Sequence, residues 1–70
     1  MPIIRVEMFP GRSVEQKRAF AKAVTDSFVS ICGSTPQGVQ VVFVEVDKSD
    51  WATAGRLASD APPAASPPKS

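Results

Sequence analysis

The sequence predicts a small α/β unit in which two parallel strands are joined by one helix. Residues 3–8 alternate between apolar and polar side chains, as in a strand with one covered face. Apolar residues then recur at helical spacing over 14–32, and residues 39–46 are apolar on both faces. A strand, a helix and a second strand in this order form a βαβ unit, which is right-handed in nearly all known sheets.

The first strand is predicted over 3–8 and ends at the turn residues Pro10 and Gly11. One of its faces carries three apolar side chains: Ile4, Val6 and Met8. The opposite face carries Ile3, Arg5 and Glu7, and Phe9 continues it. Because successive side chains of a strand point to opposite faces, this alternation indicates that one face is covered by the rest of the fold.

The helix has both a start signal and a stop signal. Ser13 and Gln16 have the spacing of a capping box, and Gly33 suits the left-handed residue that ends many helices. The predicted buried stripe consists of Phe20, Val24, Ser27, Phe28 and Ile31, with Ala19 and Ala23 beside it. The predicted polar face consists of Lys17, Arg18, Lys22 and Asp26.

The second strand is predicted over 39–46, with apolar residues on both faces as in parallel sheets that are covered on both sides. Residues 47–59 contain Trp51 and are predicted to form a turn and a very short strand. Residues 60–70 are rich in proline, alanine and serine, and their apolar side chains are those of alanine and proline alone. We therefore expect one domain over 1–59 and a tail over 60–70 that is disordered or draped over a partner.

Such a unit is incomplete by itself. One helix covers one face of a two-stranded sheet, whereas the apolar residues of 39–46 need cover on the other face as well. The sheet also has two edges, which natural proteins pair or protect. About sixty ordered residues form only a marginal core, so we expect a homo-oligomer.

Composition and charge exclude several function classes. The formal net charge is +1 and the basic residues are scattered, which argues against nucleic-acid and membrane partners. With no histidine and one cysteine, we expect no metal site within the chain and no cofactor. Cys32 cannot form an internal disulfide and is expected to be a small buried apolar residue. No apolar run approaches the ~18 residues of a membrane helix and no leader is present, so we expect a cytoplasmic protein.

Pro2 is the first candidate for chemistry. When proline follows the initiator methionine, removal of Met1 normally leaves its nitrogen as a free secondary amine. An α-amino group titrates near ~8, and burial lowers that pKa further because it disfavours the charged form. Such an amine can act as a general base near neutral pH. The alternative interpretation is that Pro2 only permits trimming, or starts an edge strand where no N–H is needed.

Arg12 and Trp51 are the other candidates. Arg12 lies just before a helix N-terminus, where free N–H groups and the helix dipole favour an anion. Its guanidinium can hold a carboxylate through two parallel hydrogen bonds, although a solvated loop arginine is the simpler alternative. Trp51 can line a site, fill the core or fill an interface. Arg5 and Arg56 are most simply solvent or interface charges.

Four segments together resemble the 4-oxalocrotonate tautomerase family. They are Pro2-Ile3, the Gly-Arg-Ser-Val-Glu-Gln-Lys run at 11–17, the valine-rich strand at 39–46 and the Gly-Arg-Leu-Ala-Ser run at 55–59. The resemblance implies a βαβ subunit assembled into a barrel-like hexamer, a trimer of dimers, with sites shared between subunits. It also implies that Pro2 is a general base acting on enol or 2-keto acids, that Arg12 binds the substrate carboxylate and that Trp51 forms an apolar wall.

One position departs from the family pattern. Well-studied members have a second arginine, which polarises the substrate's carbonyl oxygen, where this chain has Gln40. Gln40 is then a substrate-binding candidate that donates a hydrogen bond without charge, and the alternatives are that Arg5, a backbone N–H or a partner chain meets this oxygen. The superfamily also includes trans-3-chloroacrylic acid dehalogenases built from two different chains, whose catalytic chain has a water-activating glutamate. This chain has Thr53 at that place, with Asp50 nearby. A tautomerase is therefore the main hypothesis, and a subunit of a dehalogenase-like hetero-oligomer or a non-catalytic assembly subunit are the alternatives.

Overall fold

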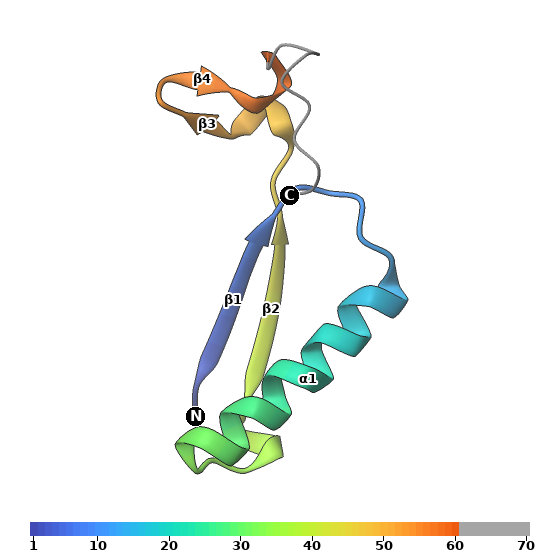
Figure 1. The fold of residues 1–70 in the computed structure, drawn as a ribbon, viewed down its shortest axis with the longest axis vertical. Coiled ribbons are helices and arrows are strands. Elements are labelled where there is room, and N and C mark those ends of the chain that lie inside the picture. The colour runs from blue at the N-terminus through green and yellow to red at the C-terminus, as the bar shows by residue number, and fades with distance from the viewer. Residues whose placement is uncertain (61–70) are drawn as a thin grey trace.

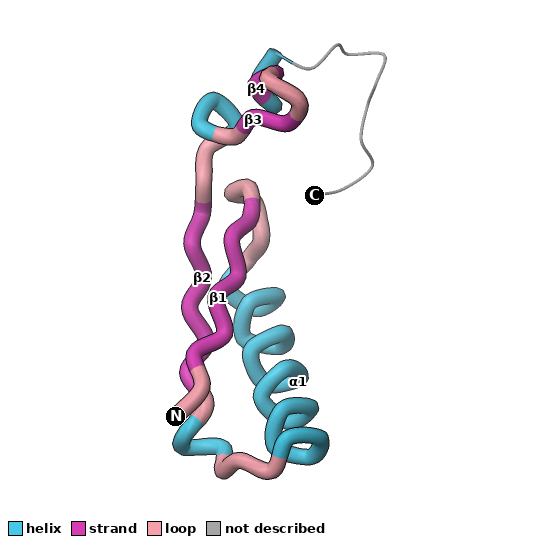
Figure 2. The backbone as a smooth tube through the Cα atoms, turned by 90° about the vertical axis from the view of Figure 1, so that its left-hand side faces the viewer, coloured by secondary structure: helices cyan, strands magenta, loops and turns pink. Residues whose placement is uncertain are grey.

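The chain forms the predicted βαβ unit (Figures 1 and 2). The computed structural model describes residues 1–60, so the predicted tail lies outside the described residues from residue 61 onward. Strand β1 (Ile3–Met8) leads into helix α1 (Val14–Cys32), and the chain returns as strand β2 (Gln40–Glu45). In both views α1 lies along one side of the β1–β2 pair.

β1 and β2 pair in parallel, from Ile3 opposite Gln40 to Met8 opposite Glu45. The second strand was predicted over 39–46, one residue longer at each end than the observed strand. Backbone hydrogen bonds continue past both ends, because Gln40 N donates to Pro2 O at 2.9 Å and Val46 N donates to Met8 O at 2.8 Å. The parallel pairing therefore extends over nearly the whole predicted range.

The two faces of this sheet differ in their cover. The face against α1, called the helix face below, carries Ile4, Val6, Met8, Val41, Phe43 and Glu45. The other face, called the open face, carries Ile3, Arg5, Glu7, Gln40, Val42 and Val44. The alternation predicted for 3–8 is confirmed, since the helix-face residues of β1 are half-buried and the open-face residues are exposed.

Helix α1 begins and ends where its capping signals place it. The Ser13 hydroxyl accepts a hydrogen bond from Gln16 N at 3.1 Å, and the Gln16 side chain accepts one from Ser13 N at 2.9 Å. These two bonds complete the predicted capping box. At the other end Gly33 has a φ of 80°, and its N–H donates to Val29 O at 3.1 Å. Glycine adopts this left-handed conformation without steric cost, so it ends the helix.

The predicted buried stripe of the helix is partly wrong. Ile31 was placed on it but is 80% exposed. Phe20 faces the sheet, since its ring meets Phe43 of β2 edge-on with ring centroids 6.2 Å apart, but 47% of the residue stays exposed. The half-buried helix residues are instead Lys17, Ala21, Val24, Thr25, Phe28 and Val29. A sheet of two strands is narrow, so it covers only the centre of the apolar stripe and leaves its margins exposed. Lys17, predicted for the polar face, lies against the sheet.

Two further expectations need correction. Cys32 was expected to be buried but is exposed, because it is the last residue of α1 and lies beyond the sheet. The single short strand expected within 47–59 is a pair of very short antiparallel strands, β3 (Ala52–Thr53) and β4 (Arg56–Leu57). Their two-residue turn has positive φ at Ala54 (55°) and Gly55 (79°), as the favoured hairpin turns require. The hairpin stands beyond the end of the β1–β2 pair (Figure 1).

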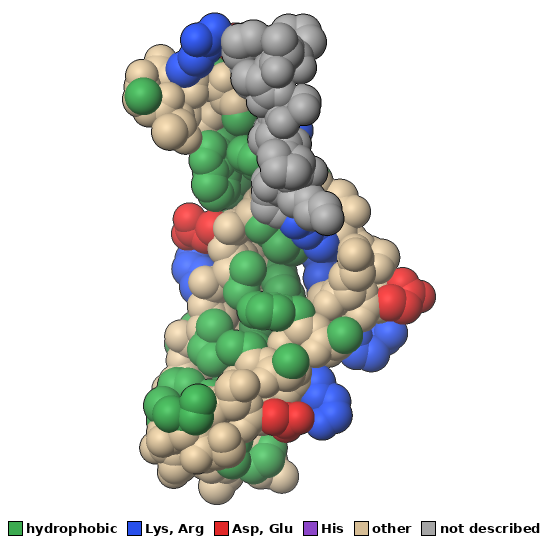
Figure 3. Space-filling model, in the orientation of Figure 1, with side chains coloured by type: hydrophobic (Ala, Val, Ile, Leu, Met, Phe, Trp, Pro, Cys, Tyr) green, Lys and Arg blue, Asp and Glu red, His purple; other side chains and the backbone are tan. Residues whose placement is uncertain are grey.

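Within the described residues, the isolated chain buries little apolar surface. Val39 is its one buried hydrophobic residue, and Ile3 and Val42 stay exposed on the open face. Figure 3 shows hydrophobic side chains at the surface between the sheet and the helix. An unfilled core of this kind agrees with the prediction of a homo-oligomer, which stays a prediction. No helix in the described part of the chain is long and apolar enough to cross a membrane.

Candidate functional site

Pro2 is anchored to the sheet at the start of β1. Its carbonyl oxygen accepts the hydrogen bond from Gln40 N, and the residue is half-buried. The preceding Met1 is exposed and makes no strand pair. A proline fits here because it has no N–H to donate at the first position of a strand. Its nitrogen therefore has a fixed place at one end of the β1–β2 pair.

Gln40 lies beside Pro2 along the backbone, but its side chain belongs to the open face. It pairs with Ile3, and parallel partners point their side chains to the same side of the sheet. Pro2 precedes Ile3 by one residue, so its ring belongs to the helix face. Within one chain, the sheet thus separates the Gln40 side chain from the proline ring.

Arg12 lies between β1 and α1, at the other end of the strand pair. It lines a groove of about 420 Å³ between the sheet and the first turns of the helix. The floor of the groove is apolar: Val6, Met8, Phe20 and Phe43. Gln16 and Lys17 complete its polar rim beside Arg12. A cationic rim over an apolar floor suits an organic anion, whose carboxylate can meet the guanidinium while its carbon skeleton lies on the floor.

Trp51 lies near this same end of the sheet but lines a different groove. Its ring contacts Phe9 edge-on, with ring centroids 4.7 Å apart, and the Lys48 ammonium lies 5.4 Å from the centroid of Phe9. The groove of about 380 Å³ beside it is lined by Glu7, Val46, Asp50, Trp51 and Ala52.

The turn before Trp51 is fixed by a side-chain cap. Asp47 precedes the 3-10 turn Lys48–Asp50, and its carboxylate accepts hydrogen bonds from the hydroxyl and the backbone N–H of Ser49. The hydroxyl contact is the larger cause, and together the two bonds lower the pKa of the Asp47 carboxyl. This cap directs the chain from β2 into Trp51.

One chain does not bring the four predicted site residues into one pocket. Pro2 and Gln40 lie at the start of the strand pair, whereas Arg12 and Trp51 lie past its end. The six residues of β1 span about 20 Å, which is farther than a small substrate can bridge. A site that uses all four residues must therefore take them from more than one chain.

The sequence patterns missed two neighbours of these residues. Phe9 was expected only to continue a face of the first strand, whereas its ring contacts Trp51, in a segment that no local pattern connects to it. Lys17 was assigned to the polar face, yet it forms an ion pair with Glu45, 28 residues away. In residues 1–60, no group of three or more His, Cys, Asp or Glu side chains could hold a metal ion.

Known proteins match the chain over nearly all of its length. The family model described as "Tautomerase enzyme" matches residues 2–61. A probable tautomerase of Ralstonia nicotianae is 42% identical over 62 residues, which cover 89% of this chain and 95% of that protein. One of Halalkalibacterium halodurans is 38% identical over 60 residues, covering 86% and 98%.

Solved structures give the same result for the fold. The crystal structure of YwhB, a homologue of 4-oxalocrotonate tautomerase, is 33% identical and superposes with a TM-score of 0.83. The match covers 87% of this chain and all of YwhB. A heterohexamer 4-oxalocrotonate tautomerase from Chloroflexus aurantiacus is 27% identical with a TM-score of 0.79, covering 86% and 97%.

Proposed function

Because the chain belongs to the tautomerase family, we propose that it is an isomerase that moves a proton within small enol or 2-keto acids. The base is the secondary amine of Pro2, freed by removal of Met1. In its neutral form the amine nitrogen takes a proton from the enol hydroxyl or from a carbon beside the carbonyl. The resulting ammonium returns a proton at another position of the conjugated anion, and the amine is regenerated.

The place of Pro2 in the sheet is the observation that carries this proposal. A base must be held in position, and the hydrogen bond from Gln40 N to Pro2 O anchors the residue at 2.9 Å. The residue is already half-buried in the single chain. Apolar cover from a neighbouring copy lowers the pKa of the amine further, because burial disfavours the ammonium form. A larger share of the amine is then neutral at physiological pH.

Arg12 binds the carboxylate of the substrate. The carboxylate is charged in both the enol and the keto form, so the guanidinium binds both through paired charge-assisted hydrogen bonds. Gln40 donates a neutral hydrogen bond to the substrate oxygen on which negative charge develops, and Trp51 provides an apolar wall that excludes water. A neutral donor stabilises this charge less than an arginine does, so the proton transfer is slower than with a guanidinium at this position.

These residues come together between copies of the chain. Pro2 and Arg12 are separated by the length of β1, so the amine of one copy meets the guanidinium of another. The family relationship favours a hexamer built as a trimer of dimers. Pairing of sheet edges and cover of the open face, where Ile3 is 65% exposed, stabilise such an assembly.

The proposal is tested by turnover of the purified chain with phenylenolpyruvate, a monoacid, and 2-hydroxymuconate, a diacid. Both reactions are followed by ultraviolet absorption, and native mass spectrometry measures the assembly in the same preparation. We expect turnover of at least one substrate by a single-chain oligomer. A correctly assembled oligomer that turns over neither substrate contradicts the proposal.

A hetero-oligomer is the second candidate. The similarity to the Chloroflexus aurantiacus heterohexamer and the neutral Gln40 favour it, because a second kind of chain can supply a missing cation. In that case the purified chain alone is inactive, and activity appears when the partner chain is added. A non-catalytic assembly role predicts inactivity in both experiments.

A further inference from the structure

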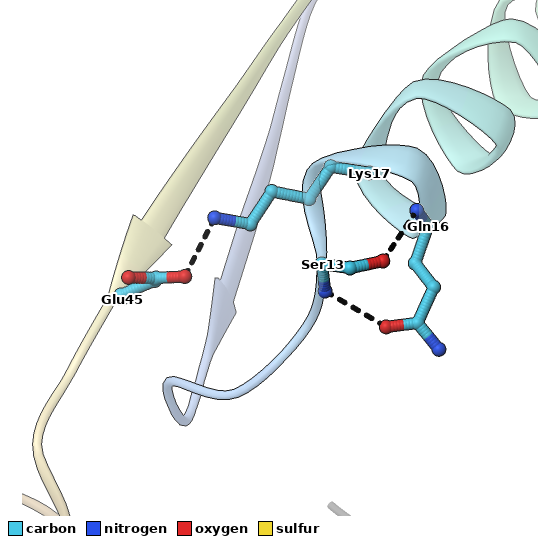
Figure 4. Close-up of polar contacts among 4 residues, drawn as sticks. All are labelled: Ser13, Gln16, Lys17 and Glu45. Atoms are coloured by element: carbon cyan, nitrogen blue, oxygen red, sulfur yellow. Dashed lines mark hydrogen bonds and ion pairs between the residues drawn. The ribbon is translucent and has the colours of Figure 1, made fainter.

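The ion pair between Lys17 and Glu45 joins the first turns of α1 to the end of β2. The Lys17 ammonium nitrogen lies 2.6 Å from a Glu45 carboxylate oxygen (Figure 4). The two side chains are 27% and 39% exposed, so solvent screens this pair less than the other ion pairs of the described chain. Those other pairs, Arg5–Glu7 and Lys22–Asp26, each lie within one element.

This contact closes a loop of the chain that contains Arg12. Met8 and Glu45 are register partners at the ends of β1 and β2, and Val46 N fixes the Met8 carbonyl. From Met8 the chain runs through Arg12 to the Ser13 cap and the first turn of the helix. Lys17 then returns to Glu45 and completes the loop. Figure 4 shows its two ties: the capping box at Ser13 and the ion pair across to β2.

The two ties have different effects on Arg12. The capping box orders the first turn of the helix through hydrogen bonds within that turn, so it does not depend on contact between the helix and the sheet. The ion pair sets the distance between that helix start and the sheet. Without it, we expect the cap and Arg12 to move away from the sheet together, because a further contact between α1 and β2, the edge-on pair of Phe20 and Phe43 with ring centroids 6.2 Å apart, lies about one turn further along the helix.

We infer that the Lys17–Glu45 ion pair is a positioning device that holds Arg12 at the distance from the sheet needed to bind the substrate carboxylate. This inference rests on the proposed function, which gives Arg12 that carboxylate. Glu45 has a second effect: its carboxylate pairs with the Lys17 ammonium, which lines the same groove as Arg12, and so competes with the substrate for it. The substrate carboxylate is then bound by the bidentate arginine and not by the lysine.

The alternative role for Lys17 is direct binding of the substrate carboxylate. The two roles predict opposite changes in KM for the Glu45→Gln variant. If the pair positions Arg12, Glu45→Gln and Lys17→Met both raise KM for the acid about two- to fivefold, as expected for a partly exposed ion pair. The double variant then shows no larger effect than either single one, and kcat changes little. If Lys17 binds substrate directly, Glu45→Gln frees the ammonium and lowers KM.

The experiment measures kcat and KM for phenylenolpyruvate and its methyl ester in these variants, with native mass as the check on assembly. The effect of the ion pair on KM should be small with the ester, which lacks the charge that Arg12 binds. Lys17→Arg, which keeps a cation that can pair with Glu45, should have the wild-type KM for the acid, in contrast to Lys17→Met. If Glu45→Gln does not assemble, Glu45→Asp, which shortens the side chain, carries the same expected rise in KM.

The matched control is Asp26→Asn, which removes an ion pair of similar length, 2.8 Å, on the exposed side of the same helix. It should leave KM unchanged. An unchanged or lower KM in Glu45→Gln, or equal changes for acid and ester, overturns the positioning role. If Arg12→Ala raises KM but Glu45→Gln does not, the proposed function stands and this inference fails. A wild-type oligomer with no activity overturns both.

Discussion

At the scale of single residues, the candidate site depends on three side chains with different physical tasks. In the proposed function, Pro2 supplies a base whose pKa burial can lower, Arg12 supplies charge for a carboxylate, and Gln40 supplies a neutral hydrogen-bond donor. The first two tasks use residue types that suit them well. For the third task, glutamine is a neutral donor that stabilises a developing negative charge less than an arginine would, so Gln40 is the position at which a substitution is expected to raise kcat.

Arg12→Ala should raise KM for acid substrates about ten- to hundredfold, because hydrogen bonds to charged groups contribute about 1.5–3 kcal/mol. kcat should change less, since the carboxylate is bound in both ground state and transition state. Steady-state kinetics with phenylenolpyruvate and its methyl ester check this, and Arg18→Ala, an exposed arginine of α1, is the control. Equal losses with acid and ester would show that Arg12 acts on something other than the carboxylate.

Gln40→Arg should raise kcat on the order of tenfold, because a charged donor stabilises a developing oxyanion better than a neutral one. Gln40→Met, which keeps the side-chain length but removes the donor, should lower kcat. The two variants are compared by initial rates at saturating substrate after native mass has confirmed assembly. If neither substitution changes kcat, the oxyanion is stabilised elsewhere, and Arg5 is the next residue to substitute.

At the scale of elements, local patterns were sufficient for β1, for β2 to within one residue at each end, and for the ends of the helix, but not for the β3–β4 hairpin. Alternation gave the faces of β1, and Ser13, Gln16 and Gly33 gave the limits of α1, because each depends on residues a few positions apart. The contacts that place Arg12 and Trp51 could not be found in this way. Lys17–Glu45 and Phe9–Trp51 join distant segments, and the exposure of Phe20 depends on how narrow the sheet is.

Ser13→Ala should lower the free energy of unfolding by about 1 kcal/mol, because α1 loses the hydroxyl of its capping box. Ser13→Asp, which keeps an acceptor at the cap, should retain most of the stability. Urea denaturation at one fixed protein concentration measures both variants. Equal stability of Ser13→Ala and wild type would mean that contacts other than the cap hold the helix start.

At the scale of the whole molecule, the described part of the single chain buries little apolar surface, so we expect it to be unstable alone. Val39 is its one buried hydrophobic residue among those described, while Ile3, Val42 and Phe20 are exposed. Pro2 and Arg12 lie at opposite ends of β1, so a site that uses both residues also needs a second copy of the chain. We therefore expect folding and activity both to depend on association.

The thermal midpoint should rise with protein concentration, because association stabilises the folded state by mass action. Differential scanning calorimetry over a hundredfold range of concentration, paired with native mass at each concentration, makes this measurement. A folded monomer at micromolar concentration with a constant midpoint would contradict the shared site as well as the assembly.

The central claim is that the amine of Pro2 is the base, and it is tested most directly by comparing chains with and without a free Pro2 nitrogen. Inserting a leucine between Met1 and Pro2 keeps the nitrogen in a peptide bond, and intact mass verifies both preparations. We expect the chain that begins at Pro2 to turn over phenylenolpyruvate and the extended chain, assembled to the same native mass, to be inactive. Equal kcat in the two preparations would show that Pro2 is not the base.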